Sequence, residues 1–107
     1  MADKADEILK NYRTIAVVGL SGKPWRASHG VSAYMQSQGY RIIPVNPRET
    51  EILGETVYPD LESIPEPVEI VNVFRRSEHA AEVAREAVRT GAKALWLQEG
   101  IASEEAA

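Results

Sequence analysis

The sequence predicts an α/β domain built around a parallel sheet. Three apolar runs rich in β-branched residues, at 14–18, 41–45 and 69–74, are typical of strands that are covered on both faces. Segments with helical spacing of apolar residues lie between them, so that strand and helix alternate at intervals of about 25 residues. Such crossovers join parallel strands through right-handed βαβ units. The length of 107 residues is that of a single domain.

The first strand, predicted at residues 14–18, leads into a loop of unusual length. A short helix is expected before it, over residues 3–11. The strand breaks at Gly19, and the residues that follow are small, basic or turn-forming. About nine residues separate this strand from the next helix, which is long for a connection between a strand and a helix.

The helix after this loop is predicted over residues 28–38. Ser28 is in position to cap its first turn, and Gly39 stands where a left-handed C-cap is expected. The expected apolar face recurs at spacings of three and four and consists of Val31, Tyr34 and Met35.

The second strand, at residues 41–45, ends at Asn46 and Pro47. An irregular region follows, with a turn predicted over residues 49–54 and a short edge strand over residues 55–58. Prolines between residues 59 and 67 stop any regular element from growing through this part of the chain.

The last third of the chain predicts a second strand–helix–strand unit. A buried strand is expected over residues 69–74, and the clearest helix of the chain follows over residues 77–90. Ser77 is its predicted N-cap, and Gly91 comes directly after its end. The final strand is predicted over residues 92–97. The expected architecture is a three-layer, Rossmann-like sandwich with helices on both faces and strand order 3-2-1-4-5, in which residues 55–58 form the edge strand. Ligands of such folds bind beside the first strand, where the two halves of the sheet meet.

The loop after the first strand departs from the dinucleotide fingerprint G-x-G-x-x-G/A. It reads Gly19-Leu20-Ser21-Gly22-Lys23-Pro24, with Ser at the second glycine position and Pro at the third. The physical requirements of a phosphate-binding loop are still met, because Gly19 permits the turn and Gly22 permits close approach of a ligand. Ser21 and Lys23 are able to donate hydrogen bonds to phosphate oxygens. An ordinary strand-to-helix turn is the alternative.

The end of the second strand argues against NAD. Enzymes that use NAD place an acidic residue there to hold the ribose hydroxyls. This chain instead has Val45-Asn46-Pro47-Arg48. Arg48 suits an additional phosphate on the ribose, as in NADP or in the 3′-phosphorylated adenosine of coenzyme A, and a solvated surface arginine is the alternative.

Two more strand ends fall on the same edge of the predicted sheet. Phe74 and Arg75 close the third main strand, and the Arg75 guanidinium is a candidate partner for a pyrophosphate. Gln98 and Glu99 follow the last strand, where the Glu99 carboxylate either accepts a hydrogen bond from a ribose or amide or belongs to a simple turn.

Composition excludes several other classes of function. The net charge of −4 argues against nucleic acid or an anionic membrane surface as a partner. The absence of cysteine excludes disulfides, thiolate nucleophiles and cysteine zinc sites. No apolar run is long enough to span a bilayer, and the expected location is the cytoplasm. His29, His79 and Ser21 lack the partners of a catalytic group, so no catalytic site is predicted.

Several of these segments together resemble a known family. The chain is similar to small bacterial and archaeal CoA-binding proteins, which in turn resemble the N-terminal CoA-binding domain of the succinyl-CoA synthetase α-subunit. The motifs that carry the resemblance are Val18-Gly19-Leu20-Ser21, Gly39-Tyr40-Arg41, Pro44-Val45-Asn46-Pro47, Ile52-Leu53-Gly54, Val73-Phe74-Arg75 and Trp96-Leu97-Gln98-Glu99-Gly100-Ile101.

The resemblance assigns CoA or an acyl-CoA as the ligand. It implies that Ser21-Gly22-Lys23-Pro24 holds the CoA phosphates and that Leu97-Gln98-Glu99 is a further contact stretch. The family's basic contact residue lies one position after Arg48, where this chain has Glu49, so Arg48 must supply the charge. The family continues with another helix, a strand and a cysteine-bearing tail. Residues 1–107 are therefore expected to form a single CoA-binding domain that lacks this C-terminal part.

Three functions therefore stay open at this point. The first is a non-catalytic module that binds CoA. The second is an enzyme component, either a fragment of an NADP-dependent reductase or a subunit of an acyl-CoA ligase. The synthetase's phosphorylated histidine belongs to a second domain, so ligase chemistry does not follow from the resemblance. The third is a structural or interaction domain without a ligand. A protein partner or a homo-oligomer is compatible with all three.

Overall fold

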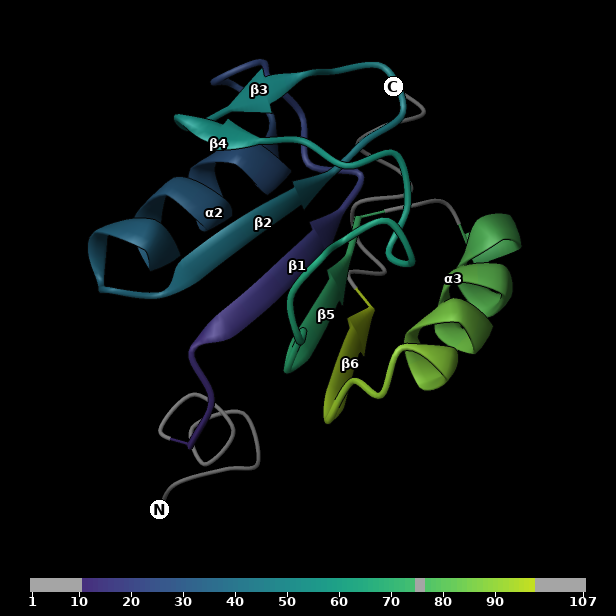
Figure 1. Ribbon diagram of the computed structural model, residues 1–107. Helices are drawn as coiled ribbons and strands as arrows, with labels where there is room; N and C mark the ends of the chain where they lie inside the picture. The colour runs from purple at the N-terminus through teal and green to yellow at the C-terminus, as the bar shows by residue number, and fades with distance from the viewer. Residues whose placement is uncertain (1–10, 75–76, 98–107) are drawn as a thin grey trace.

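The computed structural model describes residues 11–74 and 77–97 (Figure 1). Its centre is a four-stranded parallel sheet in the order β2-β1-β5-β6. The strands are β1 (Thr14–Val18), β2 (Arg41–Val45), β5 (Ile70–Val73) and β6 (Ala94–Leu97). The α/β class and the parallel sheet are confirmed. The bounds of β1 and β2 agree with the prediction at both ends, and β5 and β6 are each shorter by two residues.

The edge strand predicted over residues 55–58, and with it the strand order 3-2-1-4-5, is not confirmed, because the main sheet has four strands among the described residues. Residues 51–52 and 55–56 instead form an antiparallel hairpin, β3 (Glu51–Ile52) and β4 (Glu55–Thr56). Leu53 and Gly54 have φ values of 55° and 76°, the left-handed conformation of a tight hairpin turn. This turn folds the chain back on itself, and Tyr58 then forms a parallel bridge to Val45 at the edge of β2.

The helices α2 (Ala27–Ser37) and α3 (Ser77–Arg89) accompany the sheet, close to their predicted bounds. The prediction that Ser28 caps α2 is wrong. Arg26 occupies the N-cap position without a capping hydrogen bond from its own side chain, and Ser28 lies buried inside the helix. Gly39 follows α2 with a φ of 92°, as expected for its left-handed C-cap. The cap predicted for Ser77 falls outside the described side chains.

Alternating strand residues divide the core into two clusters. Ile15, Val17 and Ile42 belong to the first, against which Met35 of α2 packs. The second contains Ala16, Val18, Ile43, Val71 and Ala87, with Val83 packed against it. Figure 1 shows α2 beside β2 and α3 beside β6. The apolar face predicted for α2 is partly wrong, because Tyr34 is 64% exposed while Ser28 and Ser32 face the sheet.

The helix predicted over residues 3–11 falls almost entirely outside the described residues. None of the helices in the described residues has the length and hydrophobicity of a membrane span.

Candidate functional site

The parallel strands bring two polar segments together at their carboxyl ends. One is the loop of residues 19–26 after β1, and the other is the turn of residues 46–49 after β2. The Gly19 N–H donates to the Val45 carbonyl over 2.8 Å, and Asn46 Nδ2 donates to the Leu20 carbonyl over 3.0 Å. Asn46 Oδ1 accepts a hydrogen bond from the Arg48 N–H over 2.9 Å. Asn46 therefore clamps the turn to the loop.

The loop is also held by two hydroxyl groups. The Ser21 N–H donates to Ser28 Oγ and the Lys23 N–H donates to Ser21 Oγ, each over 3.0 Å. These two backbone amides are thus already paired inside the protein and do not point to a ligand. No described residue accepts a hydrogen bond from the Gly22 N–H. Donors that remain at the loop include this amide and the side chains of Ser21 and Lys23.

Gly22 lies against a carboxylate. A Cβ at this position would collide with Glu49 Oε2, and Glu49 Cδ would lie 3.3 Å away. The space above the Gly22 backbone is therefore accessible only because glycine has no side chain, and a side chain from the 46–49 turn lies in it.

The basic side chains at this edge are exposed. Lys23 Nζ lies 6.0 Å from the ring centroid of Trp25, which is 75% exposed, and Arg48 is exposed on the neighbouring turn. None of the ion pairs between described residues involves Lys23 or Arg48. Both cations are therefore available to an anion from outside the protein.

A cavity of about 530 Å³ opens beside the same strand ends. Its floor includes Val18, Val45 and Pro47, and α3 contributes an acidic wall with Glu82 and Glu86. The volume falls within the range of small-molecule sites. Part of its acidic wall has structural partners, since the Glu62 carboxylate, which also lines the cavity, pairs with Arg89 over 2.8 Å.

The structure gives less support to a ligand-binding role for the remaining predicted site residues. Phe74 is 3% exposed and packs in the first core cluster, so its side chain is directed away from any ligand at the surface. Pro24 is exposed in the loop. Arg75, Gln98 and Glu99 lie outside the described residues. In the described part of the chain, no three His, Asp or Glu residues are arranged to hold a metal ion.

Sequence reasoning missed a second, smaller cavity of about 110 Å³ between α2 and the sheet. Ser32 and Asn72 line it together with apolar residues such as Met35 and Trp96. The Ser32 hydroxyl is buried and has no hydrogen-bond partner among the described residues. The available signal was the asparagine within the apolar run that became β5, since an amide rarely enters a core strand without a polar neighbour.

Comparison with known proteins identifies relatives of this arrangement. The model of a family described as a CoA binding domain matches residues 13–107. A Bacillus subtilis protein named "Uncharacterized protein YneT" is 52% identical over 100 residues, which cover 94% of this chain and 74% of the relative. A hypothetical protein from Pyrococcus horikoshii has a similar structure, with a TM-score of 0.83 and 38% identity over 94% of this chain and 73% of its own.

A larger protein shares the fold over part of its length. The dinucleotide-forming acetyl-coenzyme A synthetase 1 of Ca. Korarchaeum cryptofilum, in complex with phosphate and ADP, has a TM-score of 0.75 and 27% identity to this chain. The similarity covers 83% of this chain and 20% of the synthetase. The fold described here therefore also occurs as one part of a much longer enzyme.

Proposed function

Since the chain belongs to the CoA-binding domain family, we propose that it binds coenzyme A or an acyl-CoA at the carboxyl edge of its sheet as a non-catalytic module. The observation that carries this proposal is the clamp between the 19–26 loop and the 46–49 turn. The clamp holds the loop that carries Lys23 against the turn that carries Arg48, and Pro47 of this turn also lines the cavity of about 530 Å³. Cations and a cavity at the switch point of a parallel sheet suit a phosphorylated, elongated ligand.

The diphosphate of the ligand lies over the backbone at Gly22 in this proposal. The Gly22 N–H, the Ser21 hydroxyl and the Lys23 ammonium are the donors, and hydrogen bonds from a cation to phosphate are about twice as strong as neutral ones. Arg48 faces the 3′-phosphate of the ribose. The residues assigned to the ligand are Gly19, Ser21, Gly22, Lys23, Pro24, Asn46, Pro47 and Arg48, while Arg75, Gln98 and Glu99 stay predictions from the family resemblance.

A binding module is favoured over an enzyme component by the chemistry of the edge. The donors there are suited to holding phosphate, and two carboxylates of the cavity wall, Glu62 and Glu86, have structural partners inside the protein. The similarity to one fifth of an acetyl-coenzyme A synthetase supports the alternative of a ligase subunit. That alternative requires the remaining catalytic parts to come from elsewhere.

The proposal also retains the finer features predicted from the sequence. The packing of α2 and α3 against different core clusters supports a three-layer, Rossmann-like sandwich with helices on both faces. These features include a cytoplasmic location and a protein partner or homo-oligomer, and the net charge of −4 argues against nucleic acid or an anionic membrane surface as a partner.

Calorimetric titration with CoA, dephospho-CoA, NAD and NADP tests the proposal. We expect CoA to bind most tightly and dephospho-CoA about tenfold more weakly, because one charge-assisted contact to Arg48 is lost. CoA at a hundred times its Kd is expected to stabilise the fold by about 2.7 kcal/mol. Binding of NADP as tight as that of CoA would favour the reductase, and no binding of any of the four would leave a structural domain.

A further inference from the structure

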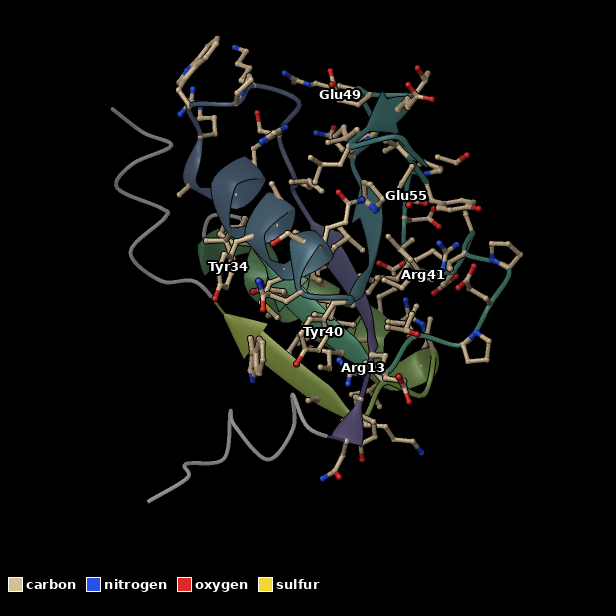
Figure 2. The ribbon with its side chains drawn as sticks, turned by 90° about the vertical axis from the view of Figure 1, so that its left-hand side faces the viewer. Arg13, Tyr34, Tyr40, Arg41, Glu49 and Glu55 are labelled. Carbon is tan, nitrogen blue, oxygen red and sulfur yellow. The ribbon has the colours of Figure 1, made fainter. Side chains whose placement is uncertain are left out.

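We infer that Glu49 is a built-in competitor of the ligand's phosphate groups, whose carboxylate sets the affinity of the site. Its carboxylate occupies the space over the Gly22 backbone, which is the place that the proposed function assigns to the diphosphate. Figure 2 shows Glu49 at the opposite end of β2 from Arg41. This inference rests on the proposed function and names the residue that tunes it.

The fold holds the 46–49 turn in the position that makes this contact. Asn46 Nδ2 bonds the Leu20 carbonyl in the loop, and Asn46 Oδ1 bonds the Arg48 N–H in the turn. The Glu49 N–H closes the turn by donating to the Asn46 carbonyl over 3.5 Å. With its backbone fixed in this way, the Glu49 side chain reaches back across the loop to Gly22.

Two properties allow the Glu49 carboxylate to leave the space over Gly22 when a ligand binds. Its side chain accepts no hydrogen bond from any described residue, and none of the ion pairs between described residues includes it. The residue is exposed, so its carboxylate is able to swing into solvent when a ligand arrives. A ligand thus binds by displacing the carboxylate, at a cost in affinity.

The magnitude follows from the charge. A carboxylate that leaves Gly22 but remains about 4 Å from one phosphate charge in water weakens binding about fivefold, and a second phosphate charge increases the effect. Salt screens such a repulsion, because the Debye length falls to a few ångströms as the salt concentration approaches 1 M. The effect of Glu49 is therefore expected to be large at low salt and small at high salt.

The test compares Glu49→Gln with Glu51→Gln by calorimetric titration with CoA at low salt and at about 0.5 M NaCl. Both variants lose one negative charge, but Glu51 is an exposed residue of β3 and makes no contact with Gly22 in the structure. We expect Glu49→Gln to bind CoA about five- to tenfold more tightly than the wild type at low salt. The gain shrinks at high salt, and Glu51→Gln stays within about twofold of the wild type.

The outcomes separate this inference from the proposed function. If the wild type binds CoA and Glu49→Gln binds it no more tightly, the inference is wrong and the proposed function stands. An equal gain in Glu51→Gln would also overturn it, because the effect would then come from net charge alone. If none of the three proteins binds CoA, the proposed function fails, and the competitor role fails with it.

Discussion

The basic side chains Arg41 at one edge of the sheet and Lys23 and Arg48 at the other differ in whether they form ion pairs. At the amino edge, where the strands begin, Arg41 pairs with Glu66 over 2.7 Å and with Glu55 over 3.3 Å (Figure 2). At the carboxyl edge, Lys23 and Arg48 are exposed and take part in none of the ion pairs between described residues. Charges that are paired internally stabilise the fold, whereas charges without an internal partner are free to meet a ligand.

At the amino edge, the carboxylate of Glu69, just before β5, also binds the chain at the start of β1. Glu69 Oε1 accepts hydrogen bonds from the backbone N–H groups of Arg13 and Thr14, over 2.9 Å and 3.1 Å. These donors, Arg13 first, lower the pKa of Glu69, and the hydrogen bond from Arg41 lowers the pKa of Glu66. The guanidinium of Arg13 lies 5.1 Å from the ring centroid of Tyr40, next to β2. The contrast between the edges predicts that changes at one affect binding and changes at the other affect stability.

The largest effect is expected from Gly22→Val. The new side chain fills the space proposed for the diphosphate, and we expect CoA affinity to fall at least about a hundredfold, which corresponds to about 2.7 kcal/mol. The fold should survive, because the atoms that a Cβ meets belong to the flexible end of Glu49. Calorimetry and thermal unfolding measure the two properties.

Gly30→Ala is the matched control for this variant. Gly30 lies in α2, and a Cβ there meets no atom within 4 Å. We expect unchanged CoA affinity and a gain in stability of up to about 1 kcal/mol, since alanine favours a helix. If Gly22→Val binds CoA like the wild type, the assignment of the loop is wrong.

The next largest effect is expected from Asn46→Ala, which removes the clamp between loop and turn. Both the bond to the Leu20 carbonyl and the bond from the Arg48 N–H are lost. We expect CoA to bind about tenfold more weakly, because the two segments are no longer fixed relative to each other. Calorimetry on the folded variant measures this loss. An unchanged Kd would show that the clamp serves the fold alone.

At the amino edge, Glu69→Ala is expected to cost about 1–2 kcal/mol of stability, because two backbone donors lose their acceptor. CoA affinity should not change. The pKa of Glu69 is lowered in the folded state, so its contribution is present above the ordinary value of 4.5 and is lost as the pH falls below it. Urea unfolding between pH 3 and pH 7 should show a smaller acid-induced loss in the variant. A parallel pH dependence would contradict this role.

The smallest effect is expected from Arg41→Ala. Its ion pairs with Glu66 and Glu55 are partly exposed, and surface pairs contribute at most about 1 kcal/mol. Thermal unfolding should show a decrease within that limit, with CoA affinity unchanged. A loss of CoA affinity would mean that the two edges are not independent.

Much of the fold was predictable because long buried strands carry a strong signal. The β-branched runs that became β1 and β2 left no alternative to two-sided burial, and Gly39 and Gly91 marked the ends of both helices correctly. The hairpin was not predictable from the same patterns. Its two-residue strands are too short for periodicity, and its turn depends on a left-handed Leu53, a residue that rarely adopts this conformation.

The carboxyl edge was predictable in its composition but not in its hydrogen bonds. The sequence placed Gly22, Lys23 and Arg48 at one edge, because parallel strands end together. It could not show that Ser28 binds the loop instead of capping α2, since serine is suited to both roles and the course of the backbone decides between them. Nor could it show that Asn46 clamps the loop to the turn.

The most direct test is a titration of the ¹⁵N-labelled protein with CoA, followed by backbone amide shifts in NMR spectra. If the ligand binds at the carboxyl edge beside Lys23 and Arg48, the amide signals of Gly22, Lys23 and the 46–49 turn shift together, with one Kd. The amides of Arg13, Thr14 and Arg41 at the amino edge stay unchanged. Shifts concentrated at the amino edge, or binding that leaves Gly22 and the turn unaffected, would contradict the account.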